Sequence, residues 1–269
     1  MSGFSAGWLT LREPYDLRAR NSTVLDAVAA SFKPLSLVRV VDLACGTGST
    51  LRALSPRLPA QQSWKLIDND LDLLARAEAT PLAKDTAVTA VALDLNRDFE
   101  AALEGAVDLV AISALLDLVS DTWLNRLAVA IVARSIPIYA ALSYDGRIEI
   151  TPPDPLDAAI LAAVNAHQRT DKGFGPALGP AAAAFAIARL EALGYSVARG
   201  ESDWTIGPDD RDMQTEILAG WASAAHNIGA LPLASTTAWL ARRSAAVTAG
   251  CSSLHVGHVD FFATPSATR

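Results

Sequence analysis

The sequence has little of several things that would assign a protein quickly to a class. Only two of its 269 residues are cysteines, Cys45 and Cys251. This number excludes a disulfide framework and favours a reducing compartment, which we expect to be the cytoplasm. No charge-free apolar run reaches the roughly 18 residues of a membrane span, and the first residues lack the basic and apolar regions of a signal peptide. We therefore expect no membrane association.

Positive charge is also scarce. The formal net charge is −7, and lysine and arginine form no cluster. Because nucleic-acid binding depends on neutralising phosphates with clustered cations, we expect no nucleic-acid partner. Apolar residues are plentiful at 51%, against 19% charged residues. A chain of this length and composition is typical of one compact catalytic domain with a large core.

The most informative stretch is VVDLACGTGST, residues 40–50. It predicts a buried strand that ends near Asp42, a turn bracketed by Gly46 and Gly48, and the start of a helix. A phosphate-binding loop for nucleoside triphosphates would need a lysine after its last glycine, and a dinucleotide fingerprint would need a third glycine where Leu51 stands. The turn therefore suits a nucleoside ligand without a pyrophosphate, and a purely structural turn is the alternative.

A second signal follows about twenty residues later. The predicted strand 63–67 ends in Asp68-Asn69-Asp70, and a carboxylate at this spacing can accept from both hydroxyls of a ribose. The alternative is that Asp68 or Asp70 only caps the next helix; we assign the ribose to Asp68 and the cap to Asp70. Two more predicted strands, 87–93 and 107–112, also end in polar residues. Four strands would thus deliver such residues to one edge of a sheet.

These motifs carry a resemblance. In this order, VVDLACGTGS, LIDND, ALDL and DLVAISALLDL resemble the motifs of class I S-adenosylmethionine-dependent methyltransferases of the bacterial small-molecule type, over about residues 38–143. The resemblance implies S-adenosylmethionine as cofactor, S-adenosylhomocysteine as product, and no metal. It also implies a role for each matching residue. For the methionine part and the sulfonium, Asp42, Ala44, Gly46 and Gly48 would line the methionine, and Ser113 and Leu115 would lie beside the sulfonium. For the nucleoside, Asp68 would bind the ribose, Asn69 and Leu95 would flank the adenine, and Asp94 would accept from its exocyclic amine.

The expected fold class is α/β, a Rossmann-like sheet of seven mostly parallel strands with helices on both faces, an antiparallel last strand and a helical N-terminal extension. We expect an N-terminal cover over 1–36 and a methyltransferase domain over 37–269, with a helix-loop insertion at about 151–180. Local signals predict a turn at 144–147, a helix from Asp154 to His167, irregular chain over 169–180, and strands over 195–204 and 254–264.

The acceptor site is expected near the fifth strand, 138–143. The segment after it carries His167, Arg169 and Lys172, which would form a lid over an anionic acceptor with His167 as base; a solvated helix end is the alternative. Two further catalytic candidates at this edge are Asp117, which alternatively caps a helix, and Tyr144. At the N-terminus, Trp8, Arg12 and Arg20 either fold over the cofactor or belong to a solvent-facing arginine stripe. We count Arg20, with Arg169 and Lys172, among the residues of the lid over the substrate.

The leading hypothesis is methyl transfer to oxygen or nitrogen of a small-molecule acceptor. The alternatives are a non-catalytic binding or partner subunit of the same fold and, third, a nicotinamide-dependent reductase, which Leu51 disfavours. The sequence is compatible with a homodimer as well as with a monomer. His255 and His258 would point to opposite faces of one strand, so we expect no metal site there.

Overall fold

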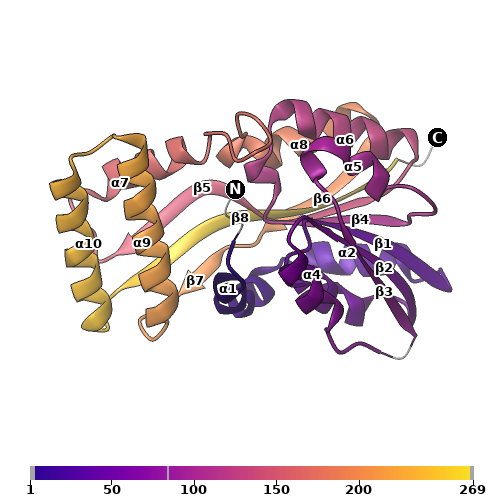
Figure 1. The fold of residues 1–269 in the computed structure, drawn as a ribbon, viewed down its shortest axis with the longest axis horizontal. Helices are drawn as coiled ribbons and strands as arrows, with labels where there is room; N and C mark the ends of the chain where they lie inside the picture. Colours follow the sequence, from indigo (N-terminus) through magenta and orange to yellow (C-terminus); the bar gives the residue numbers. More distant parts are fainter. Residues whose placement is uncertain (1–3, 84, 267–269) are drawn as a thin grey trace.

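The computed structural model describes residues 4–83 and 85–266, which form a mixed sheet of eight strands with helices on both faces (Figure 1). Seven strands follow the order β3-β2-β1-β4-β5-β8-β6, and β7 pairs with β8 off this path. Strands β1 to β5 pair in parallel, whereas β8 is antiparallel to β5, β6 and β7. The expected Rossmann-like sheet with an antiparallel last strand is thus confirmed.

The strands are β1 Leu37–Leu43, β2 Gln61–Asp68, β3 Thr86–Ala92, β4 Leu109–Ser113, β5 Ile138–Thr151, β6 Tyr195–Glu201, β7 Trp204–Ile206 and β8 Ser253–Pro265. The helices are α1 Ala6–Ala19, α2 Ser22–Phe32, α3 Ser49–Leu54, α4 Leu71–Glu78, α5 Leu95–Ala102, α6 Asp121–Ala133, α7 Asp157–His167, α8 Ala182–Ala192, α9 Arg211–Ile228 and α10 Leu233–Thr248. Short 3₁₀ turns occupy η1 Ser55–Arg57, η2 Leu116–Leu118 and η3 Gly179–Ala181.

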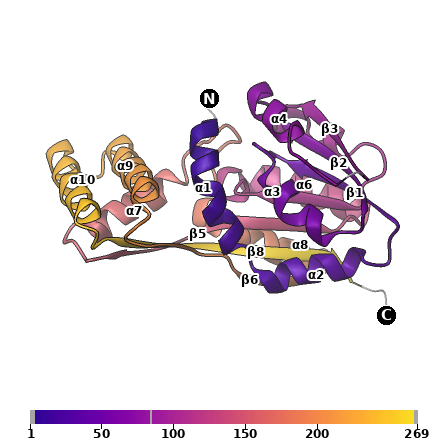
Figure 2. The same ribbon diagram turned by 90° about the horizontal axis from the view of Figure 1, so that it is seen from below.

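Two apolar cores sandwich the parallel half of the sheet. On one face, α5, α6 and α8 pack through side chains such as Phe99, Trp123 and Ile187. On the other face, α2, α3 and α4 pack through Val28, Leu51 and Leu74 (Figure 2). Strands covered on both faces are apolar nearly throughout, which explains the continuous hydrophobic runs of β1 and β4.

A third core lies where β5 and β8 extend beyond the parallel half of the sheet. Helices α7, α9 and α10 cover one face of this extension, as the left side of Figure 1 shows, and bury Ile160, Ile217 and Trp239. We call α7, α9 and α10, together with β7 and the adjoining parts of β5 and β8, the helical lobe. Strands β5 and β8 are longer than the others because they continue from the parallel half of the sheet into this lobe.

The structure corrects three local predictions. The prediction of a turn at 144–147 is wrong, because β5 continues through these residues. Its pairing with β8 is irregular on both sides of Ser143-Tyr144. The predicted strand 195–204 is divided into β6 and β7 at Ser202 and Asp203, which bond the backbone of His258 instead. Helix α7 starts at Asp157 rather than Asp154, since the Asp154 carboxylate accepts from Leu156 N in a turn before the helix.

The N-terminal extension is helical, as expected, and α1 runs between the glycine turn and the helical lobe (Figure 2). The Tyr15 hydroxyl donates to Asp210 Oδ1 at 2.7 Å, which ties α1 to the loop before α9. Glu13 pairs with Arg52 of α3, which ties it to the glycine turn. Helix α1 therefore spans both halves of the molecule. None of the helices within the described ranges has the length and apolarity that crossing a bilayer requires.

Candidate active site

The glycine turn between β1 and α3 is held by Asp68. Its carboxylate accepts from Gly46 N at 2.9 Å and from Asp70 N at 3.1 Å. Gly46 and Gly48 have φ values of +54° and +85°, and a Cβ on Gly46 would lie 3.3 Å from Leu9 Cδ1 of α1. The conformation thus favours glycine at both positions, and a side chain at Gly46 would require Leu9 of α1 to move by a few tenths of an ångström.

Backbone strain gathers at the same edge of the sheet. Ala44, Ala114 and Leu142 have φ values of +56°, +51° and +54°. Ala44 and Ala114 directly follow β1 and β4, and Leu142 lies within β5 at an irregularity of its pairing with β8. Each such residue costs about 1–2 kcal/mol in the left-handed region, and strain of this kind clusters at functional sites. Sequence reasoning missed this feature because alanine and leucine carry no signal for a left-handed conformation.

Asp42, the last polar residue of β1, is fully buried. Neither of its carboxylate oxygens has a hydrogen-bond partner among the described residues. Burial raises its pKa to about 8, with the nearby Asp68 adding to the effect and Arg20 opposing it. A buried acceptor that the protein leaves unmatched indicates a place for a cationic donor.

Arg20, just past α1, is buried opposite this carboxylate. Its guanidinium donates to Tyr139 Oη at 3.2 Å and to Ser113 Oγ at 3.2 Å, and lies near the hydroxyls of Ser49 and Thr50, while its Nε is unmatched in the described part of the chain. Arg12 is buried too, whereas Arg18 is exposed. The alternative of a solvent-facing arginine stripe is therefore wrong for Arg12 and Arg20, because α1 packs between the two halves of the molecule.

The nucleoside-side candidates lie at the ends of β2 and β3, which are neighbours in the sheet. Asp70 caps α4 by accepting from Asp72 N and Leu73 N, as expected. Asp94 caps α5, because its Oδ1 accepts from Asn96 N at 3.0 Å. The side chains of Asp94 and Asn69 are both exposed. Leu95 is buried, and its carbonyl accepts from Trp123 Nε1 at 2.7 Å. These contacts leave lone pairs free on the carboxylates of Asp68 and Asp94.

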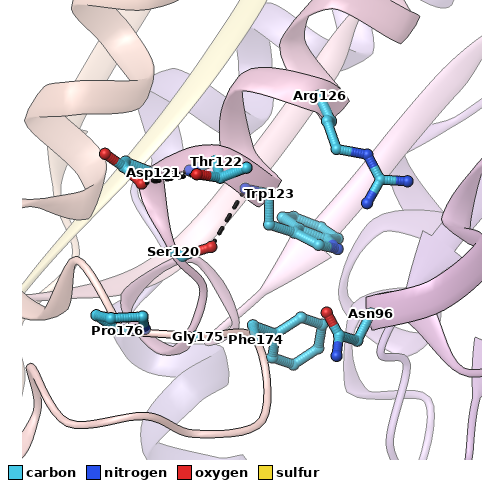
Figure 3. Close-up of a pocket in the computed structure, with 9 residues that line it drawn as sticks. All are labelled: Asn96, Ser120, Asp121, Thr122, Trp123, Arg126, Phe174, Gly175 and Pro176. Atoms are coloured by element: carbon cyan, nitrogen blue, oxygen red, sulfur yellow. Dashed lines mark hydrogen bonds between the residues drawn. The ribbon is translucent and has the colours of Figure 1, made fainter.

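A cavity of about 320 Å³ lies between the starts of α5 and α6 and the loop before η3 (Figure 3). Phe174 of this loop packs edge-on against Trp123 at 5.6 Å between ring centroids. Ser120 caps α6 by accepting from Trp123 N, so the alternative that Asp117 caps this helix is wrong. The cavity is lined by Asn96, Ser120, Asp121, Thr122, Trp123, Arg126, Phe174, Gly175 and Pro176.

Asp117 lies instead in η2, directly after β4, and is 6% exposed. Its Oδ1 has no partner among the described residues. Burial raises its pKa to about 6, against the lowering effect of a backbone hydrogen bond and of the charges on Arg12 and Lys172. The carboxylate is therefore ionised at neutral pH yet ready to take up a proton.

The segment 169–180 lies beside the ends of β4 and β5. Leu178 N donates to Val119 O at 2.9 Å, and Lys172 Nζ lies 3.2 Å from His167 Nδ1. Burial, together with the charge of Lys172, lowers the pKa of His167. Arg169 is exposed and bonds Asn165 O on α7. The same Asn165 also contacts Tyr144, which is buried and whose hydroxyl donates to Asn165 Oδ1 at 2.7 Å.

The two histidines of β8, His255 and His258, each contact a different residue of the protein. His255 Nε2 lies 2.9 Å from Asp203 Oδ2, and His258 packs against the Trp204 ring at 4.7 Å between centroids. No cluster that could hold a metal ion occurs in residues 4–83 and 85–266.

Known proteins resemble this chain in part of its sequence and in its fold. Residues 40–134 match the methyltransferase domain family model. No curated protein is a significant match. A solved cyclopropane-fatty-acyl-phospholipid synthase-like protein from Lactobacillus casei shares the fold, with a TM-score of 0.55, 14% identity and coverage of 97% of this chain and 94% of that one.

Another similar structure is a S-adenosylmethionine-dependent methyltransferase from Thiobacillus denitrificans, with S-adenosylhomocysteine bound (TM-score 0.44, 16% identity, coverage 97% and 99%). A third is the corresponding complex from Geobacter sulfurreducens (TM-score 0.41, 18% identity, coverage 97% and 99%). The match over residues 40–134 shows a methyltransferase domain in this part of the chain, set in a Rossmann-like sheet with its polar residues at one edge.

Proposed function

We propose that the protein transfers a methyl group from S-adenosylmethionine to oxygen or nitrogen of a small-molecule acceptor, with the cofactor lying across the carboxyl ends of β1 to β4. The observation that carries the proposal is the pair of buried, incompletely hydrogen-bonded ionisable groups of Asp42 and Arg20. The two free cysteines are compatible with action in the cytoplasm.

Asp42 and Arg20 fit the amino-acid end of the cofactor. A methionine moiety carries an ammonium and a carboxylate on one carbon, and the two protein groups offer the opposite charge for each. Arg20 already bonds Ser113 at the end of β4, so its guanidinium spans from the glycine turn toward the expected sulfonium. Arg20 therefore belongs to the cofactor side in this proposal, not to the lid over the acceptor.

The nucleoside end fits the ends of β2 and β3. Asp68 would accept from the ribose hydroxyls with its remaining lone pairs, while Asn69 and Leu95 flank the adenine and Asp94 accepts from its exocyclic amine. The close backbone approach at Ala44, Gly46 and Gly48 lets the ligand lie against the turn. Leu115 would complete the wall beside the sulfonium.

The acceptor would bind between η2 and the loop 169–180. Transfer of a methyl group by in-line displacement needs mainly the placement of a nucleophile, plus a base where that nucleophile carries a proton. Asp117, Tyr144 and His167 are the candidates to hold or receive this proton. Lys172 and the exposed Arg169 would bound the pocket from the loop side, as parts of a lid.

Calorimetric titration with S-adenosylhomocysteine tests the cofactor site. Because the pKa of Asp42 is about 8, its carboxyl is mostly protonated at pH 7 and would lose that proton when an ammonium binds. Titrations in buffers of different ionisation enthalpy should therefore show about one proton released per ligand.

The Asp42→Asn variant should bind more weakly and release no proton. A matched control is Asp212→Asn, an exposed position on α9, which should behave like the wild type. Equal proton release from the wild type and from Asp42→Asn would remove Asp42 from the site.

A further inference from the structure

Side chains from six different elements form a ring beside the carboxyl ends of β4 and β5. On one side of the ring, the Arg12 guanidinium lies 5.4 Å from the Trp204 ring centroid. Trp204 stands 4.7 Å from His258, and His258 stands 6.1 Å from Tyr144, both between ring centroids. Helix α1 and strands β7, β8 and β5 are thus linked through neighbouring side chains.

The other side of the ring passes through α7 and the loop. Tyr144 bonds Asn165 at 2.7 Å, and α7 ends at His167, whose ring nitrogen lies 3.2 Å from Lys172 Nζ. The charges of Lys172 and Arg12 both lower the pKa of Asp117, so the Asp117 carboxyl of η2 lies within electrostatic reach of both ends of this series. We call the following six residues the acceptor ring: Arg12, Asp117, Tyr144, Lys172, Trp204 and His258.

Arg12 is held so that one edge of its guanidinium stays free. Asp16 Oδ2 accepts from Arg12 Nε at 2.9 Å, and Asp16 Oδ1 accepts from Trp204 Nε1 at 3.0 Å. The Arg12 side chain is only 10% exposed, yet Nη1 and Nη2 bond no described residue of the protein. A fixed, buried guanidinium that presents this edge matches the two oxygens of a carboxylate.

Asp117 supplies the opposite charge. Within the described residues it forms an ion pair with neither Arg12 nor Lys172, although it feels the charge of both, and its Oδ1 is buried without a partner. The two other titratable members of the ring are uncharged at neutral pH. Burial lowers the pKa of His258 to about 3 and raises that of Tyr144 above its usual range. The ring therefore holds separated positive and negative groups.

We propose, on the basis of the proposed function, that the acceptor is a small carboxylic acid whose carboxylate binds the Nη1–Nη2 edge of Arg12 while its hydroxyl or amino group faces Asp117. In the transfer step, the acceptor's oxygen or nitrogen forms the new bond to the methyl carbon. The carbon–sulfur bond breaks with its electron pair left on sulfur, which becomes a neutral thioether. The proton of the hydroxyl or ammonium group passes to Asp117 and then to water.

The binding test uses the protein saturated with S-adenosylhomocysteine and three matched probe pairs: acetate and acetamide, glycolate and glycolamide, and benzoate and benzamide. We expect at least one acid to bind at least 10-fold more tightly than its amide. The Arg12→Gln variant should lose about 10- to 100-fold in affinity for that acid, because a charge-assisted pair is lost, with no change for the amide. Arg12→Lys keeps the charge without the fork and should fall between.

Arg18→Gln is the control, since Arg18 is the exposed arginine of the same helix; it should bind acid and amide like the wild type. Affinity for S-adenosylhomocysteine and the thermal unfolding midpoint show that each variant retains its cofactor site and fold, and Arg12→Lys serves if Arg12→Gln does not fold. Equal affinity for acid and amide in all three pairs, or an Arg12→Lys variant with wild-type preference, would overturn the inference.

Different results would contradict the proposed function and the proposed acceptor class. A wild-type protein that does not bind S-adenosylhomocysteine contradicts the proposed function. A protein that binds it and methylates only the methyl esters or amides of hydroxy and amino acids, and not the acids themselves, contradicts the acceptor class alone.

Discussion

The parallel half of the sheet and the helical lobe hold their polar groups in different ways. At the ends of β1 to β3, short local contacts do most of the work: Asp68 bonds Gly46 and Asp70, and Asp94 caps its own helix. In the lobe, Asp157 at the start of α7 binds Trp239 and Arg243 of α10, more than eighty residues later. The nucleoside side of the proposed cofactor site is thus built from neighbouring segments, whereas Arg20 and the acceptor side depend on distant ones.

This difference has a consequence for function. The nucleoside side, made of local turns, keeps its shape as long as the parallel sheet is folded. The acceptor ring needs α1, β7, β8 and α7 to be docked together, so the lobe can alter acceptor binding without altering the nucleoside side. Variants in each half should therefore separate stability, cofactor binding and acceptor binding.

The largest effect is expected from Asp157→Ala in the lobe. Arg243 is 2% exposed, and the change would leave this buried cation without its carboxylate and Trp239 Nε1 without its acceptor. We expect unfolding to become easier by about 3–5 kcal/mol, as in other broken buried pairs, measured by urea denaturation. Arg242→Met, which removes the half-exposed cation that pairs with Asp154, should have a clearly smaller effect. An equal loss in both variants would contradict the buried role of Asp157.

Asp117→Asn should stabilise the protein while removing a proposed base. The folded-state pKa is about 6, against 3.8 for an unperturbed aspartate, so the folded protein holds this proton more tightly than the unfolded chain. The stability this provides is present below about pH 4 and is lost as pH rises through 6. At pH 7 the neutral variant should gain about 3 kcal/mol over the wild type.

Urea denaturation of both proteins from pH 3.5 to 7.5 measures this difference. The gain should vanish at the acid end, and Asp212→Asn should show no such trend. A gain of Asp117→Asn that is constant with pH would show that burial of charge is not its cause.

Asp68→Ala and Asp70→Ala compare two neighbouring carboxylates with different assigned roles. Losing Asp68 should weaken S-adenosylhomocysteine binding by about 1–3 kcal/mol, since the ribose and Gly46 N lose a charged acceptor. Losing the α4 cap at Asp70 should cost about 1 kcal/mol of folding stability with unchanged ligand affinity. Calorimetry and thermal unfolding of both variants measure these outcomes, and unchanged affinity in Asp68→Ala would remove Asp68 from the site.

The smallest effects are expected from two glycines, one in each half. Gly220 lies in α9 with open space around its missing side chain, so Gly220→Ala should add about 0.5–1 kcal/mol of stability. Gly46 has a φ of +54°, so Gly46→Ala should cost about 1–2 kcal/mol and also weaken cofactor binding. A thermal unfolding scan of the pair tests the contrast, and a stabilised Gly46→Ala would contradict the strained turn.

The sequence predicted the parallel half well because its signals are local. A strand that ends in a polar residue, a glycine pair and the spacing to Asp68 can each be recognised without knowing the partner strand. The prediction for Asp70 as a helix cap was correct for the same reason. The turn at 144–147 was wrong because local composition favours a turn, whereas pairing with β8, a hundred residues later, keeps the strand going.

Much of the candidate site gave no local signal. Asp42 was recognised from its place at a strand end, but its unmatched burial beside Arg20 required the packing of α1. The burial of Arg12 was equally hidden, since an arginine on a helix is most often exposed. Asp260 bonds Asn21 N and Leu142 N and so fixes the chain next to Arg20. Its role depends on β8 lying between β5 and β6, an arrangement that no short motif specifies.

The central claim is that the glycine turn of this chain binds S-adenosylmethionine. Side-by-side calorimetric titrations with S-adenosylmethionine, S-adenosylhomocysteine and NAD test it most directly. The account predicts one site per chain for the two sulfur compounds, weakened by Asp68→Ala, and no binding of NAD. Binding of NAD without either sulfur compound would contradict the account and favour a nicotinamide-dependent enzyme.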